Sequence, residues 1–164
     1  MKGHPIDSDL ARAHAAAAAV LDPEIPVLTL ADLGVLRGVS RANGRIVVRL
    51  TPTYTGCPAT AAIRHAVETA LRDAGVDACV ETELSPAWST DDITAEGRRK
   101  LEAFGIAPPA GKGKHRALFT EETVSCPRCG SQRTVKLSEF GSTPCKALWR
   151  CAECREPFDY FKCL

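Results

Sequence analysis

Hydrophobic residues follow helical spacing in two segments, residues 8–21 and 58–74. In both of them an apolar residue recurs every three or four positions, which leaves one apolar face for packing. A third helix is expected at about residues 90–104, because Ser89 can cap its start and Gly105 can end it. We expect the first helix to end at Asp22, because the residue before a proline disfavours helical backbone. Residues 24–36 are apolar but are interrupted by Pro26 and Gly34, which predicts a loop with one helical turn.

Alternation of apolar and polar residues marks the expected strands. Residues 76–84 alternate in this way, which is typical of a strand with one buried face. In residues 45–50 one face carries Ile46, Val48 and Leu50, and the other carries Val47 and Arg49. Asn43 and Gly44 join residues 35–41 to residues 45–50 in a hairpin, because both tolerate a positive φ. The order helix, strand, strand, helix, strand, helix predicts an α+β domain with a small mixed sheet covered by helices.

Composition changes after this domain, which we expect to span residues 1–105. Residues 106–118 are rich in proline, glycine and lysine, and this predicts a linker. Residues 119–164 have little helical periodicity but contain six of the eight cysteines, so we expect a second domain of a different kind. Within it, residues 133–137 and 147–150 are expected to form short strands.

Four cysteines of the second domain have the spacing of a zinc ribbon. Cys126 and Cys129 form one pair with two residues between them, and Cys151 and Cys154 form the second. One turn can present both thiolates of such a pair to a single ion, and two pairs supply the four ligands of tetrahedral Zn²⁺. A segment this short cannot bury enough apolar surface to fold alone, so we expect the metal to supply folding free energy.

The other two cysteines of this domain leave alternatives open. Six sulfurs would also suit an iron–sulfur cluster, which four thiolates can hold, although the paired spacing favours zinc. Cys145 can be a small buried side chain beside Leu148 and Trp149, and Cys163 a tail residue without a role. Together these two could instead form a secondary thiol pair that relays metal.

One cysteine of the first domain has a position that favours reactivity. Cys57 directly precedes the helix expected at residues 58–74, and the partial positive charge at a helix start favours a thiolate. An inert cysteine in a capping loop is equally compatible with this position. Asp22 and Glu24 place two carboxylates close together, for which a turn that ends the first helix is the simpler explanation. No hydrolase or phosphate-binding motif is present, so the residues alone indicate no catalytic site.

Charge limits the classes of partner. Residues 1–110 carry 11 basic and 14 acidic side chains, whereas residues 111–164 carry 10 basic and 6 acidic ones. The basic residues form no stripe interleaved with aromatics, so we do not expect nucleic-acid binding; a solvated surface or an acidic protein partner explains them better. A homodimer could form through a sheet edge.

Hydropathy gives an expected location. The chain shows neither a signal-peptide pattern nor an apolar run long enough for a membrane. We therefore expect a cytoplasmic protein with no membrane partner, whose cysteines are thiols or metal ligands and not disulfides.

Several motifs resemble those of known families. The first domain resembles the SufT-type iron–sulfur assembly domain in the motifs Asp22-Pro-Glu-Ile-Pro-Val27, Asp32-Leu-Gly34 and Thr51-Pro-Thr-Tyr-Thr-Gly-Cys57-Pro58. The chain as a whole resembles the PaaD family in the motifs Gly105-Ile-Ala-Pro-Pro109, Cys126-Pro-Arg-Cys129, Ser142-Thr-Pro-Cys145-Lys-Ala-Leu-Trp-Arg-Cys151 and Glu156-Pro-Phe-Asp-Tyr-Phe-Lys-Cys163. Members of that family are accessory proteins of the bacterial phenylacetyl-CoA 1,2-epoxidase.

This resemblance implies a supporting protein without turnover of its own. Its client would be a metal centre of the epoxidase, which has a di-iron oxygenase subunit and a reductase with an iron–sulfur centre. The match to the family motif makes Cys57 the functional thiol, with Asp22, Glu24, Asp32 and Thr55 around it, and transient iron or an iron–sulfur cluster as its cargo. Two alternatives stay open: an iron–sulfur redox component that passes electrons to the oxygenase, and a zinc-ribbon regulator that binds nucleic acid.

Overall fold

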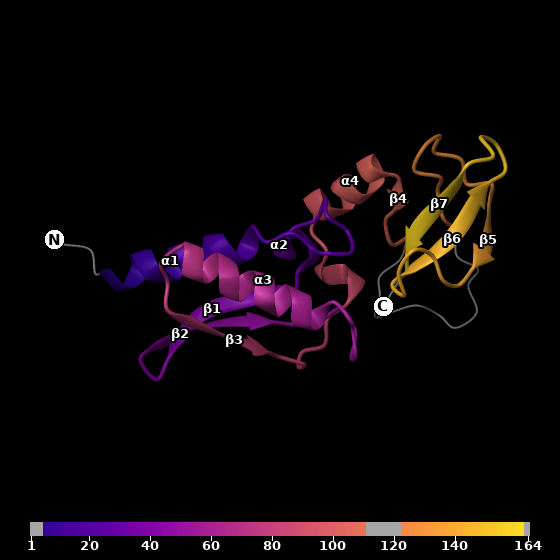
Figure 1. Cartoon of the computed structure of the whole chain (residues 1–164). Coiled ribbons are helices and arrows are strands. Elements are labelled where there is room, and N and C mark those ends of the chain that lie inside the picture. Colours follow the sequence, from indigo (N-terminus) through magenta and orange to yellow (C-terminus); the bar gives the residue numbers. More distant parts are fainter. Residues whose placement is uncertain (1–4, 111–122, 163–164) are drawn as a thin grey trace. The chain divides into compact units, whose positions relative to one another are not determined.

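The chain forms two units, each built around its own small sheet (Figure 1). The first unit comprises residues 1–88 and the second residues 89–164. The computed structural model describes residues 5–110 and 123–162. Helices and strands occur in both units, so the predicted α+β class is confirmed. Within the described ranges, no helix has the length and apolar character needed to span a membrane.

A three-stranded mixed sheet organises the first unit. β1 (Leu36–Ala42) and β2 (Arg45–Leu50) pair antiparallel, and β3 (Ala78–Thr82) pairs in parallel with β2. The two residues of the predicted turn both have positive φ, 49° at Asn43 and 78° at Gly44. The hairpin and the mixed sheet expected from the sequence are therefore present, with the order β1-β2-β3.

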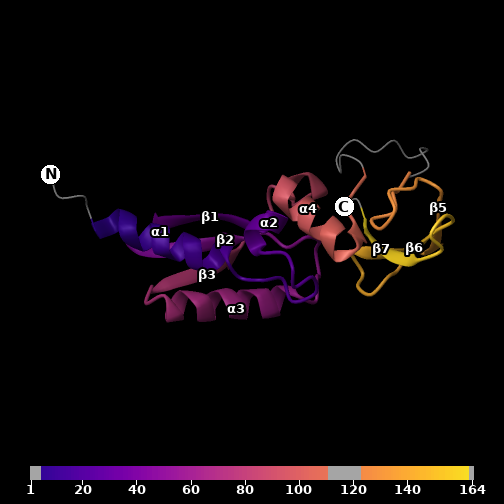
Figure 2. The same ribbon diagram turned by 90° about the horizontal axis from the view of Figure 1, so that it is seen from above.

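Two helices cover one face of this sheet. Figures 1 and 2 show α1 (Pro5–Ala18) over β1 and β2, with α3 (Thr60–Asp73) beside it and next to β3. The apolar stripe of α3 buries Val67 and Leu71, and α1 buries Ala17 against the same layer. This layer of helices on a sheet is the apolar core of the first unit.

The first helix ends earlier than the sequence predicts. We expected residues 8–21, but α1 stops at Ala18 because the following backbone pairs with a later segment. The amide of Leu30 donates to the carbonyl of Val20, and the amide of Asp22 donates to the carbonyl of Leu28, both at 2.9 Å. The loop then leads into the one-turn helix α2 (Leu30–Leu33).

The third predicted helix is two elements. In place of one helix at residues 90–104, the chain forms a 3₁₀ turn, η1 (Thr90–Asp92), and then α4 (Ala95–Phe104). The break occurs because Thr94 is extended and caps α4, accepting a hydrogen bond from the amide of Gly97 at 2.9 Å. Both elements fall within the second unit, whereas composition had placed the end of the first domain at residue 105.

A four-stranded sheet with the order β4-β7-β6-β5 forms the rest of the second unit. β5 (Thr134–Ser138) and β6 (Lys146–Cys151) match the two predicted strands, and β7 (Pro157–Phe161) pairs antiparallel with β6. β4 (Ile106–Ala107) pairs in parallel with β7. Neither β7 nor β4 was expected, and β4 occupies the first two residues of the segment assigned to a linker.

Candidate metal centre

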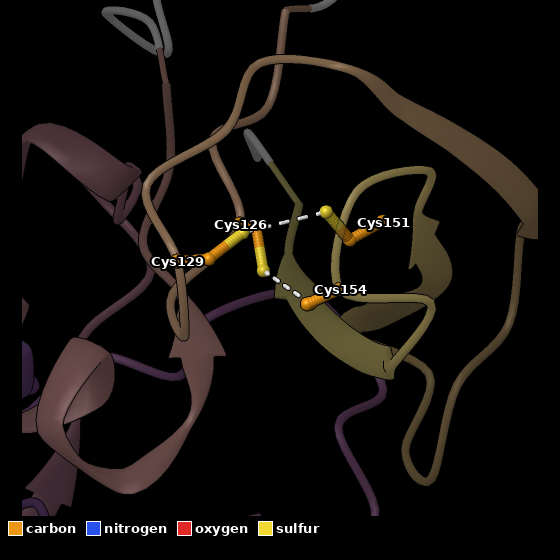
Figure 3. Close-up of side chains that lie close together, drawn as sticks. All are labelled: Cys126, Cys129, Cys151 and Cys154. Atoms are coloured by element: carbon orange, nitrogen blue, oxygen red, sulfur yellow. Dashed lines mark hydrogen bonds between the residues drawn. The ribbon is translucent and has the colours of Figure 1, made fainter.

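Four cysteine sulfurs of the second unit converge on one point (Figure 3). The side chains are those of Cys126, Cys129, Cys151 and Cys154, and all four sulfurs lie within 4.8 Å of one another. Cys126 and Cys154 approach to 3.7 Å, and Cys129 and Cys151 to 3.6 Å. The structure therefore brings together the four residues that their spacing predicted.

Two similar turns hold these sulfurs. In the first turn the amide of Gly130 donates to the carbonyl of Cys126 at 2.9 Å, and Gly130 has a φ of 73°. The residue that follows Cys154 in the second turn is Arg155, which also lies in the left-handed region with a φ of 64°. Left-handed backbone costs a side-chain-bearing residue roughly 1 kcal/mol, so the second turn is the more strained of the two.

The site is continuous with the small core of the ribbon. Cys126 and Cys151 are buried in the same cluster as Trp149 and Tyr160, whose rings meet edge to face at 5.8 Å. Next to this cluster, the hydroxyl of Thr134 donates a hydrogen bond to the carbonyl oxygen of Val124, 2.6 Å away. Few apolar side chains fill the cluster, so a bound metal would add much of the stability of this unit.

The thiols of Cys129, Cys151 and Cys154 differ in how readily they ionise. Burial opposes ionisation of Cys151, but backbone amides, that of Cys154 first, donate to its sulfur and lower its pKa to about 6. At Cys154 the amide of Glu156 favours the thiolate, yet burial and the neighbouring sulfurs raise the pKa to about 12. At Cys129 a hydrogen bond from the amide of Ser131 also favours the thiolate. The neighbouring sulfur of Cys151 and burial outweigh it, so the pKa of Cys129 is raised. A metal that binds at neutral pH must therefore displace protons from some of these sulfurs.

The sulfur positions fit a single tetrahedral ion. A Zn–S bond of about 2.3 Å places the sulfurs of a tetrahedral site about 3.8 Å apart, close to both short distances seen here. In a four-iron cluster each thiolate binds a different iron, which requires wider spacing than this arrangement has. The residues present therefore fit zinc, which would supply a closed structural site.

Cys145, one of the two remaining cysteines of this domain, does not belong to the cluster. Cys145 is buried, and its sulfur lies 3.0 Å from the hydroxyl of Thr143 and not among the four ligating sulfurs. Cys163 lies outside the described residues. Sequence reasoning did not anticipate an ion pair in the same region, in which Nζ of the buried Lys146 lies 3.6 Å from the partly exposed Asp159. Neither residue carried a recognisable sequence signal, because the register of β6 and β7 brings them together.

Cys57 lies in a tight loop ahead of α3. Its thiol is partly buried, its amide donates to the carbonyl of Tyr54, and its carbonyl accepts from the amide of Thr60, both at 3.2 Å. Each of these bonds joins residues three positions apart, whereas the bonds of an α-helix join residues four apart. The chain therefore winds more tightly here than in an α-helix. α3 consequently begins at Thr60, two residues later than predicted, and Cys57 precedes the helix without belonging to its first turn.

Two of the three carboxylates expected around this cysteine, Asp22 and Asp32, accept hydrogen bonds from nearby backbone amides. Asp22 accepts hydrogen bonds from the amides of Glu24 and Ile25 at 2.9 and 2.7 Å, and Asp32 accepts from the N-cap residue of α2 at 3.0 Å. In the described part of the chain, the four ribbon cysteines are the one group of three or more potential ligands that converges.

Thr55 is exposed beside a small cavity. This cavity has a volume of about 80 Å³ and is also lined by Tyr54 and Trp88. Cys57 is not among its lining residues, so Thr55 and Cys57 do not share this hollow.

Two family models match the chain, one in each part. Residues 110–162 match the PaaD zinc beta ribbon domain, and this range contains the four converging cysteines. Residues 11–82 match the family described as an iron–sulfur cluster assembly protein, and this range contains Cys57.

One known protein is similar to most of the chain, and a solved structure is similar to 58% of it. A protein of Escherichia coli (strain K12), named as a putative 1,2-phenylacetyl-CoA epoxidase subunit, is 51% identical over 144 residues, which cover 87% of this chain and 86% of that protein. A crystal structure of the domain of unknown function DUF59 from Bacillus anthracis is 25% identical with a TM-score of 0.51, and the match covers 58% of this chain and 92% of that one. The resemblance seen in the motifs is confirmed: this chain belongs to the PaaD family.

Proposed function

We propose that this protein is an accessory factor, without turnover of its own, that matures a metal centre of a multicomponent phenylacetyl-CoA epoxidase. One observation carries the proposal: a single chain combines an iron–sulfur assembly match over residues 11–82 with 51% identity to a protein that is named as a subunit of this epoxidase. The expected partners are the oxygenase or the reductase of that enzyme. The cytoplasmic location of the complex stays a prediction.

Cys57 is the thiol that we propose to hold iron or an iron–sulfur cluster during transfer. This residue is half-buried, and in the described residues no group of further ligands converges on it to close a site. A metal held by an incomplete ligand set keeps open coordination positions, through which a client ligand can take it over. Asp22, Glu24, Asp32 and Thr55 remain proposed surroundings of this thiol.

The ribbon, in the same proposal, holds one zinc ion for structure. The spacing of its four sulfurs supports a single ion, and four thiolates leave no coordination position for exchange. The zinc would fix the two turns and stabilise the small core that they enclose. An electron-transfer role for a cluster at these cysteines has less support, because the thiolates lie so close together.

The test compares two half-buried thiols of the first unit in cells. A strain of Escherichia coli K12 from which the 51% identical relative has been deleted would carry this chain as wild type, Cys57→Ser or Cys79→Ser. Cys79 is the matched control, because it is also partly buried and its sulfur contacts the carbonyl of Ile46 at 3.6 Å. Iron and acid-labile sulfide would be measured in the purified oxygenase and reductase, together with the epoxidation rate.

We expect Cys57→Ser to lower the metal content and the epoxidation rate to those of the deletion strain that carries no replacement. Cys79→Ser should preserve both, because its thiol only packs against β2. Wild-type metal content and activity in the Cys57→Ser strain would refute the role of this thiol.

A further inference from the structure

The outward side of the ribbon sheet carries an apolar surface that the core of the ribbon does not use. The strand register places Val135, Arg150 and Pro157 side by side across β5, β6 and β7, and Leu148 follows in the next row. Trp149 points the other way, into the buried cluster. We name the side chains of Val135, Leu148, Arg150 and Pro157 the outer ribbon face.

Further apolar side chains are exposed close to this face in the sequence. Val135 is 53% exposed, and Leu137 and Phe140, farther along the same strand and the turn that follows it, are 53% and 68% exposed. These are three of the six large hydrophobic side chains that are exposed among the described residues, and the ammonium group of Lys162 lies 4.7 Å from the centre of the Phe140 ring. β5 is an edge strand, so its exposed apolar side chains are available to a partner.

Arg150 is the charged centre of the outer ribbon face. Its guanidinium group forms no hydrogen bond or ion pair with any residue that the structure describes, and its cross-strand neighbours are Val135 and Pro157. The carboxylate in the next row, Asp159, already accepts from the hydroxyl of Ser142 at 2.7 Å and lies near Lys146. An exposed guanidinium between apolar side chains suits a partner that presents a carboxylate within an apolar surface.

The charge balance of the ribbon agrees with an acidic partner. Residues 123–162 carry seven basic and four acidic side chains. Three of the four acids are already in ion pairs, and these are Arg133–Glu153, Lys136–Glu139 and Lys146–Asp159. The ribbon therefore has basic side chains without an acidic partner, and only one of its four acidic side chains is outside these ion pairs. Its surface complements a negatively charged protein.

We propose that the outer ribbon face docks a component of the client epoxidase through an apolar contact in which a carboxylate of that component pairs with Arg150. This inference rests on the proposed function, because that function makes an epoxidase component the partner. The apolar neighbours favour a protein over a nucleic acid, whose phosphates are bound by several cations together. An arginine at the centre of an apolar contact is typical of the residues that dominate a protein interface.

The test measures binding of the zinc-loaded, full-length protein to the purified oxygenase and to the purified reductase at physiological ionic strength. Arg150→Gln removes the charge and Val135→Ser removes apolar surface, both on the outer ribbon face. Arg128→Gln is the matched control for charge, since Arg128 is an exposed cation elsewhere in the ribbon. Phe104→Ser is the control for apolar surface, because this α4 side chain is 55% exposed. Equal zinc content in all variants establishes that the ribbon is folded.

We expect Arg150→Gln to raise the dissociation constant roughly 30-fold and Val135→Ser roughly tenfold, with both controls near wild type. Wild-type affinity in the two outer-face variants would overturn the inference and leave the proposed function standing. Equal weakening by Arg128→Gln would overturn it too, because the attraction would then be diffuse. A different result would assign this face to nucleic acid. In that case the wild type would bind neither epoxidase component but would bind duplex DNA in a salt-dependent way, and Arg150→Gln alone would abolish the DNA binding. If the wild type bound neither component and Cys57→Ser left epoxidase metal content unchanged, both proposals would fail.

Discussion

Exchange of single ribbon cysteines separates metal ligands from buried thiols. We predict that Cys151→Ser weakens zinc binding at neutral pH by about two to three orders of magnitude, whereas Cys145→Ser leaves it nearly unchanged. Both side chains are buried in the same sheet region, so the two variants lose similar packing. They differ in that the sulfur of Cys151 belongs to the converging four and the sulfur of Cys145 lies beside Thr143.

The expected size of the effect follows from the ligand set. Zinc binding to small structural sites is worth about 10–16 kcal/mol at neutral pH. Four sulfurs share the ion here, so one ligand corresponds to about 2.5–4 kcal/mol, or two to three orders of magnitude in the dissociation constant. Replacing Cys145 should change this constant by less than about threefold, because no ligand is lost.

The assay is competition for zinc with a chromophoric chelator, combined with metal analysis of the dialysed protein. Limited proteolysis reports in parallel whether residues 123–162 stay folded. The assignment would be refuted if Cys151→Ser bound zinc with nearly wild-type affinity. It would equally be refuted if Cys145→Ser lost as much affinity as Cys151→Ser, since the metal would then depend on both sulfurs.

Three further predictions concern stability and pH. Trp88→Phe should destabilise the first unit by about 1–3 kcal/mol in urea unfolding, because the indole donates to the buried carbonyl of Leu33 at 2.8 Å; a loss below about 0.5 kcal/mol would contradict this. Gly141→Ala should destabilise the ribbon by about 1–3 kcal/mol, because a Cβ there would lie 2.5 Å from a carboxylate oxygen of Asp159; an unchanged thermal midpoint would show that Asp159 moves aside. Zinc binding displaces protons from the thiols of Cys129 and Cys154, whose pKa values are raised, so the zinc affinity measured with a chromophoric chelator should fall as the pH falls from about 8 to about 6. An affinity that does not change over this range would contradict this proton displacement.

Elements with a local signal could be predicted from the sequence. The hairpin between β1 and β2 follows from two residues that tolerate positive φ, and α3 follows from an unbroken apolar stripe. The metal centre was predictable for the same reason, since the ligands within each pair are separated by only two residues. Bringing the pairs together needed only the strands β5 and β6, which were also expected.

Elements that depend on competition or on distant partners could not be predicted. Ser89 and Thr94 both suit a helix start, and periodicity alone does not show that the chain uses the second for α4. β7 has only five residues and begins at a proline, which cannot donate to the ladder, so such a short alternating run did not identify a strand. Whether Cys57 has the surroundings that the family resemblance implied stays a prediction, because it depends on how separate loops meet.

The two cysteine environments favour a division of tasks between the two parts of the chain. Four thiolates around one ion bind a metal too tightly to pass it to a client protein. The ribbon is therefore poorly suited to deliver metal. The partly exposed thiol of Cys57 has the opposite property, and it is the better site for a metal that must leave. Recognition would then rest on the ribbon and delivery on the first unit. On this reasoning, Arg150→Gln should slow maturation of the client without changing how much iron the isolated protein binds, and Cys57→Ser should abolish that iron without weakening the complex.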